Sequence, residues 1–172
     1  INGTRFGDYI QGADGGDAGF NGQDGDDTII TGQGGHIYAE GGSGKDLLDA
    51  SGADQGDLHG SDGDDTLMGG SQNNQLDGGS GNDSIVGGGQ HDDIDTGSGD
   101  DLVDAGSGND YIGLSSGQDT IHGGYGYDML SFNNWGDATR HVDVVVNGVG
   151  SGTIVGEVQD GEDENQDPTY GE

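Results

Sequence analysis

Aspartate recurs at a fixed spacing along most of this chain, always close to glycine. Residues 78–104 consist of three blocks of nine residues, GGSGNDSIV, GGGQHDDID and TGSGDDLVD, each with an Asp at the sixth place and an aliphatic residue at the eighth. If such blocks stack like β-strands, about 4.8 Å apart, their carboxylates repel one another unless a cation lies between them. The spacing therefore predicts cation binding.

Calcium suits these ligands better than magnesium does. Calcium accepts about six to eight oxygen atoms from carboxylates and carbonyls, whereas magnesium demands near-ideal octahedral geometry and retains its waters. Glycine adopts positive φ without a steric penalty, which leaves the carbonyls of a turn free to point at one centre. The candidate metal ligands are the carboxylates of Asp8, Asp27, Asp46, Asp65, Asp83, Asp101, Asp119, Asp92, Asp110 and Asp128, with the backbone of Gly25, Gly42, Gly44, Gly63, Gly79, Gly81, Gly97, Gly99, Gly106, Gly108, Gly117, Gly124 and Gly126.

The aspartates form two series that differ in completeness. Every second repeat carries the acid, without a break from Asp8 to Asp119. The intervening repeats carry it only from Asp92 onward, and their earlier members at this place are Ala18, Ile37, Gly56 and Asn74. A coil with two repeats per revolution would stack each series on its own edge. We therefore expect about eight calcium ions between successive acids, most of them on one edge, with Asn74 and Asp92 as a further candidate pair.

Three repeats of the incomplete series contain ten residues instead of nine, at 12–21, 31–40 and 50–59. We expect these turns to hold no calcium ion or to be closed in a different way, because an inserted residue changes the direction in which the backbone carbonyls point. The alternative is that the irregular turns bring other acids within range of an ion, and the candidates are Asp14, Asp17, Asp54 and Asp57.

An apolar residue lies two places after each acid position. It recurs every nine or ten residues, not every three or four as on a helix, so each repeat is predicted to be one very short strand followed by a tight turn. The expected fold is all-β, a parallel roll of about seven coils with 18–19 residues each. The apolar column consists of Ile10, Phe20, Ile29, Ala39, Leu48, Leu58, Leu67, Leu76, Ile85, Ile94, Val103, Ile112, Ile121 and Leu130.

These blocks resemble the glycine-rich nonapeptide repeats of the RTX, or hemolysin-type calcium-binding, proteins. The closest copies are GGSGKDLLD (41–49), GGSGNDSIV (78–86), TGSGDDLVD (96–104), AGSGNDYIG (105–113) and GGYGYDMLS (123–131). The resemblance implies a right-handed parallel β-roll with calcium held between repeats n and n+2. It also implies a bacterial protein that type I systems secrete and that folds on extracellular calcium, as part of a larger parent such as a toxin, protease, lipase, epimerase or adhesin.

The chain divides into three expected parts. Residues 1–131 form the roll, 132–158 contribute strands that cap its open end, and 159–172 form an acidic tail. In the tail, Asp163, Asn165 and Asp167 imitate the start of an EF-hand loop, but Pro168 replaces the required glycine. Because the first residue is not Met, we expect this chain to be a piece of a longer one.

Composition excludes several classes of function. The 34 acidic residues against three basic ones give a net charge of −31, which opposes unaided binding of nucleic acid or anionic membranes. There is no cysteine, and no apolar run approaches the roughly 20 residues of a membrane span. No GxSxG or HExxH motif is present, so we expect this chain not to be an enzyme. The resemblance implies a secreted or cell-surface calcium module, which we expect to be monomeric. The alternative is an adhesive or polysaccharide-binding module that uses the irregular edge. An ice-binding surface would need regular rows of Thr and Asx side chains, and the third and fifth places of these repeats vary too much to form them.

Overall fold

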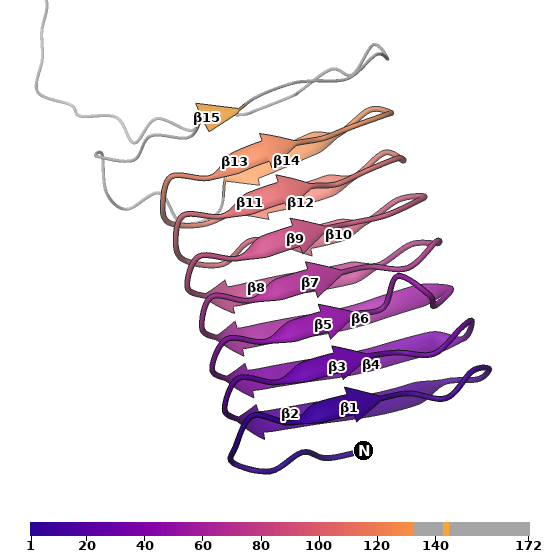
Figure 1. Ribbon diagram of the computed structural model, residues 1–172. Coiled ribbons are helices and arrows are strands. Elements are labelled where there is room, and N and C mark those ends of the chain that lie inside the picture. The colour runs from indigo at the N-terminus through magenta and orange to yellow at the C-terminus, as the bar shows by residue number, and fades with distance from the viewer. Residues whose placement is uncertain (133–142, 145–172) are drawn as a thin grey trace, which may run out of the picture.

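The computed structural model describes residues 1–132 and 143–144. Over these residues the chain winds as a coil with two short strands per revolution, and the strands stack into two parallel sheets (Figure 1). The eight-stranded sheet contains β1 (Tyr9–Gln11), β3 (Thr28–Ile30), β5 (Leu47–Asp49), β7 (Thr66–Met68), β9 (Ser84–Val86), β11 (Leu102–Asp104), β13 (Thr120–His122) and β15 (Asp143–Val144). The seven-stranded sheet contains β2 (Ala18–Asp24), β4 (His36–Ser43), β6 (Gln55–Asp62), β8 (Gln75–Ser80), β10 (Asp93–Asp95), β12 (Tyr111–Leu114) and β14 (Met129–Phe132).

The strands of each sheet pair in parallel, one revolution apart. Ile29 lies opposite Ile10, 19 residues earlier, and Val103 lies opposite Ile85, 18 residues earlier. This register confirms the predicted all-β parallel roll of about seven coils, and no helix occurs among the described residues. Within the described residues, no helix is long and apolar enough to cross a membrane.

The predicted apolar column forms the core between the sheets. Each of its residues is at most 8% exposed, from Ile10 at the N-terminal end to Leu130 in β14. Each short strand contributes its central residue to this core, because successive side chains of a strand point to opposite faces. The core is therefore thin, and the turns beside it must contribute much of the stability.

The N-terminal half of the seven-stranded sheet has longer strands. Strands β2, β4 and β6 have seven or eight residues, whereas β10 has three. In these longer strands the acid position lies inside the strand, where Ile37 is buried in the core and Ala18 packs against it. An apolar residue at the acid position thus widens the core at the place where other repeats bury a carboxylate.

The last described strand extends the eight-stranded sheet. Strand β15 pairs in parallel with β13, with Thr120 opposite Asp143. Apart from Phe132 and this strand, the predicted cap (132–158) lies outside the described residues, and the predicted tail (159–172) lies wholly outside them. The division into roll, cap and tail therefore stays a prediction.

Candidate metal centre

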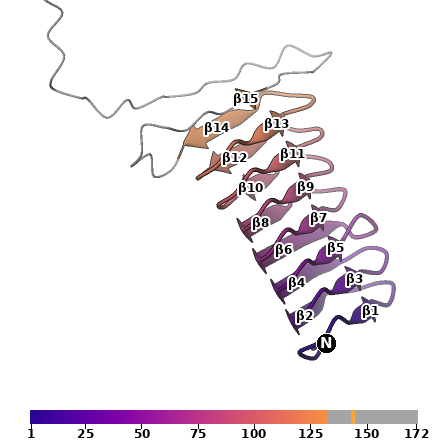
Figure 2. The same ribbon diagram turned by 60° about the vertical axis from the view of Figure 1, so that its left-hand side comes forward.

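The turns between the strands form the two edges of the roll, and they lie above one another from coil to coil (Figure 2). We call the edge where the chain enters the eight-stranded sheet the regular edge, and the edge where it enters the seven-stranded sheet the mixed edge. On the regular edge an aspartate precedes each strand from β1 to β13: Asp8, Asp27, Asp46, Asp65, Asp83, Asp101 and Asp119. On the mixed edge Asn74, Asp92, Asp110 and Asp128 precede β8, β10, β12 and β14. The structure therefore separates the two series in space.

Each of these aspartates except Asp8 holds the backbone of the preceding coil. The Oδ1 atom of Asp46 accepts a hydrogen bond from the backbone N–H of Asp27 at 2.7 Å, and Oδ1 of Asp65 accepts one from Asp46 at 2.8 Å. The same bond recurs at every step from Asp8 to Asp119 and, on the mixed edge, from Asn74 to Asp128. We call these side chains the inner row. All are buried except Asp8, which is partly exposed.

The second carboxylate oxygen of the inner row is mostly left without a partner. Among the described residues this applies to the buried Oδ2 atoms of Asp27, Asp46, Asp65, Asp83, Asp92, Asp101 and Asp110. At the N-terminal end, by contrast, the Oδ2 atom of Asp8 accepts a hydrogen bond from the Thr4 N–H at 2.6 Å. Burial of a charged oxygen without a partner is costly, so a repeated row of such atoms indicates a row of cation sites.

Around Asp65, one backbone carbonyl lies close to the unpartnered carboxylate oxygen, and two more belong to the same turn. Near Asp65, the carbonyl oxygens of Ser61 and Gly63 point toward the following coil, and that of Gly78 points back toward the preceding one. A Cβ added at Gly60 would lie 2.5 Å from both the Gly78 oxygen and Oδ2 of Asp65. Among the described residues no three His, Cys, Asp or Glu side chains gather into a metal-binding group, so carbonyls have to complete the shell. Carboxylate and carbonyl oxygens are the donors that calcium takes.

The candidate glycines have the backbone conformation that these turns require. All thirteen have φ between +79° and +153°, a range that side chains with a Cβ rarely adopt. At Gly63 a Cβ would also collide with the carbonyl oxygen of Gly44 in the preceding coil. Ser61, Gln23 and Gln90 adopt positive φ at equivalent places, so the turn is preserved even where glycine is absent.

Burial raises the pKa of the inner-row aspartates in the middle of both edges, from Asp27 to Asp101 on the regular edge and from Asp92 to Asp128 on the mixed edge. It raises the pKa of Asp65 and Asp101 to about 7, and that of Asp46, Asp92 and Asp110 to about 6. For Asp65, the hydrogen bond from the Asp46 N–H opposes the shift, while the charges of Asp46 and Asp83 add to it. The negative form of these groups is therefore less favourable in the roll than it would be in water.

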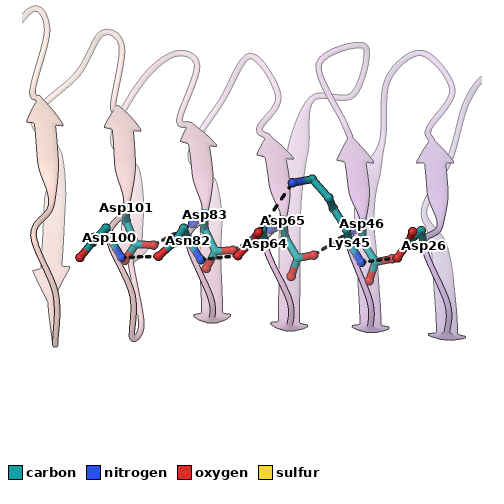
Figure 3. A network of polar contacts seen from close by, with 9 residues as sticks. All are labelled: Asp26, Lys45, Asp46, Asp64, Asp65, Asn82, Asp83, Asp100 and Asp101. Atoms are coloured by element: carbon teal, nitrogen blue, oxygen red, sulfur yellow. Dashed lines mark hydrogen bonds and ion pairs between the residues drawn. The ribbon is translucent and has the colours of Figure 1, made fainter.

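A second row of side chains, which the spacing did not indicate, lies one residue before the inner row (Figure 3). The backbone N–H of Lys45 donates to Oδ1 of Asp26 at 2.9 Å, that of Asn82 to Asp64 at 3.0 Å, and that of Asp100 to Asn82 at 2.7 Å. On the mixed edge Asn73, His91 and Asn109 accept in the same way. We call these side chains the outer row.

The outer row has the opposite polarity to the inner row. In the outer row a side chain accepts from the following coil, and in the inner row it accepts from the preceding coil. The turn backbone is thus held from both directions. The only sequence signal for this row is the frequency of short Asp and Asn side chains at the fifth place of the repeat.

The irregular turns of the mixed edge are closed by protein groups. The hydrogen bonds run from Gln33 N–H to Asp14, from His36 N–H to Asp17 and from Gly35 N–H to Asp54, at 3.0, 3.0 and 3.2 Å. The fourth alternative ligand, Asp57, lies 2.9 Å from the ring of His59 on β6. The acids near the insertions therefore serve in hydrogen bonds and do not add to the inner row.

Comparison with known families identifies the repeats between residues 59 and 131. A family model of the RTX calcium-binding nonapeptide repeat matches in four copies, at residues 59–94, 77–112, 86–121 and 113–131. Residues 59–131 are RTX calcium-binding repeats. No curated protein and no solved structure matches the chain. The matched RTX repeats include every part of the mixed edge that has an aspartate in its inner row.

The raised pKa values predict how pH acts on the metal-free RTX roll. The folded pKa values of about 6 to 7 lie above the ordinary value of 3.8, so the stability that protonation contributes is present below about pH 4 and is lost as pH rises through 6 to 7. In metal-free buffer we expect more β-structure by circular dichroism at pH 5 than at pH 8. Equal β signal at the two pH values would contradict this prediction.

Proposed function

We propose that the roll binds calcium in its turns, between successive inner-row aspartates, and that this binding maintains the fold. The observation that carries the proposal is the row of buried Oδ2 atoms without partners. The proximity of the Gly78 carbonyl oxygen to Oδ2 of Asp65 supports the proposal, and so does the match of residues 59–131 to a calcium-binding repeat. The ligands would be two carboxylates and the carbonyls of the positive-φ glycine turns around them.

The two edges would hold different numbers of ions. The regular edge offers six successive pairs: Asp8/Asp27, Asp27/Asp46, Asp46/Asp65, Asp65/Asp83, Asp83/Asp101 and Asp101/Asp119. The mixed edge offers Asp92/Asp110 and Asp110/Asp128. This gives about eight calcium ions, most of them on the regular edge. The irregular turns hold none in this proposal, because protein groups already use their acids.

Calcium would also relieve the charge of the chain. Eight ions would bring +16 against a net charge of −31. Because the apolar core is thin and the carboxylates are buried, binding and folding become a single event. Calcium is thus a structural component of the roll in this proposal, and it takes part in no reaction.

The biological role that we propose follows from calcium-dependent folding. The chain belongs to a secreted or surface-exposed bacterial protein, stays unfolded at low calcium during type I secretion, and folds on extracellular calcium to support a larger parent. The usual context of RTX repeats and the acidic composition support this role. The roll itself is a non-enzymatic, monomeric module here, and any catalytic or adhesive activity belongs to another part of the parent chain.

Folding is predicted to depend on calcium. In excess chelator at pH 7.5 circular dichroism should show a coil, and millimolar calcium should produce a cooperative β signal. Magnesium at the same concentration should not, because it releases its waters reluctantly and demands octahedral geometry. A full β spectrum in excess chelator would refute the prediction.

Loss of one inner-row carboxylate should affect two neighbouring ions. Asp65 lies between Asp46 and Asp83, so Asp65→Ala is expected to raise the calcium midpoint of folding several-fold. The control is Asp57→Ala, which removes a carboxylate outside the row and should leave the midpoint nearly unchanged. Calcium titrations followed by circular dichroism measure both variants. Equal shifts in the two would show that the inner row has no special role.

A second candidate function lies on the mixed edge. An open hollow of about 570 Å³ lies over the irregular turns, lined by polar groups that include Gln33, Asp49, Ser51, Asp54 and Ser71. Hydroxyl, amide and carboxylate groups in a shallow hollow suit a polysaccharide. We expect selective binding on a glycan array in the presence of calcium, which Ser51→Trp should abolish by filling the hollow. Unchanged binding by that variant would remove the hollow from consideration.

A further inference from the structure

Asn74 lies at a boundary on the mixed edge. The preceding coil has Gly56 at the same place, with no carboxylate, and the following coil has Asp92. Asn74 is 4% exposed, and its Oδ1 accepts hydrogen bonds from the backbone N–H of Gly56 at 2.7 Å and of Gly70 at 2.8 Å. Because both partners are N–H donors, the amide oxygen of Asn74 must face them. The amide nitrogen of Asn74 therefore faces the following coil.

The nitrogen of this amide lies among four oxygen atoms. Nδ2 of Asn74 is 2.6 Å from the Gln72 carbonyl oxygen, 2.8 Å from Oδ1 of Asp92, 3.1 Å from the Gly87 oxygen and 3.3 Å from the Gly70 oxygen. An amide nitrogen has only two hydrogens to donate, so it cannot satisfy four acceptors fully. The four oxygens are more acceptors than the two hydrogens of the amide can satisfy. Several oxygens around one point are the coordination that a hard cation such as calcium takes.

These oxygens occupy the same places as those around the aspartate pairs of the regular edge. Two of the carbonyls belong to the residues four and two places before Asn74, and the third belongs to the residue five places before Asp92. On the regular edge the corresponding carbonyls are those of Ser61 and Gly63, before Asp65, and of Gly78, before Asp83. The Asn74 nitrogen therefore lies where the regular turns leave space between two carboxylates.

We infer that the side-chain amide of Asn74 takes the place of a calcium ion in its turn. The inference rests on the proposed calcium binding and adds to it the residue that ends the row of ions on the mixed edge. The N–H groups present partial positive charge to three carbonyls and to Asp92, and no ion is needed there. Asn74 thus joins the coils with closed irregular turns to the coils with an acid inner row. Replacement of its amide by a carboxylate would turn the same shell into a calcium site.

The variant Asn74→Asp tests this inference, with Asn73→Asp as the matched control. In Asn74→Asp the retained Oδ1 accepts from Gly56 and Gly70, and the second oxygen joins the shell in place of nitrogen. Asn73 is the exposed neighbour in the outer row, so Asn73→Asp adds the same charge without a facing shell. Calcium bound per chain is counted by isothermal titration and by metal analysis after equilibrium dialysis. We expect Asn74→Asp to bind one ion more than the wild type, and Asn73→Asp to bind the same number as the wild type.

The outcomes separate the inference from the proposed function. If the wild type binds calcium and Asn74→Asp binds the same number of ions, the inference is wrong and the proposed function stands. If no protein of the set binds calcium, both are wrong. A crystal structure of the calcium-loaded wild type also tests the inference, and this test does not depend on whether a variant folds. Asn74 Nδ2 among these oxygens without an ion would support the inference, and a calcium ion on Asn74 Oδ1 would overturn it.

Discussion

The fold depends on the stacking of equivalent residues from successive coils. Successive coils are in register one revolution apart, so whatever one coil buries at a given place the next coil buries beside it. For the apolar column this repetition is favourable, as with Leu48 beside Leu67. For the inner row it places carboxylate beside carboxylate, and burial raises the pKa of Asp65 and its neighbours. In our proposal, calcium supplies the positive charge between these acids that the fold requires.

In the folded roll, hydrogen bonds fix the position of the inner-row carboxylates. One oxygen of each aspartate is used to hold the backbone of the preceding coil, which fixes the position of the other. The outer row holds the same turns from the opposite direction. Positive-φ glycines such as Gly63 then let neighbouring turns approach so closely that a side chain would have no room. In the folded roll, the turn backbone and one oxygen of each carboxylate are thus held in place by neighbouring coils.

The sequence allowed the fold to be predicted because one residue in each short strand is buried, and a period of nine is incompatible with a helix. The two series of aspartates also indicated two edges. Three features could not be predicted from spacing. In the sequence, Ile37 indicates only a repeat without an aspartate at the acid position, although its side chain extends the core. The outer row depends on the direction in which each turn presents its N–H groups. Spacing indicated Asn74 only as a further candidate ligand, because its contacts with Gly87 and Asp92 involve a different coil.

The alternation of edges sets the smallest step by which such a chain can lengthen or shorten. A duplication or loss of a single nine-residue block would exchange the edges for every later repeat, so that aspartates such as Asp83 would stack with the acid-free positions of the other series. A change of two blocks preserves the parity of everything that follows, since each coil contacts only its neighbours. The smallest change of length that preserves this architecture is therefore one whole revolution of 18 or 19 residues.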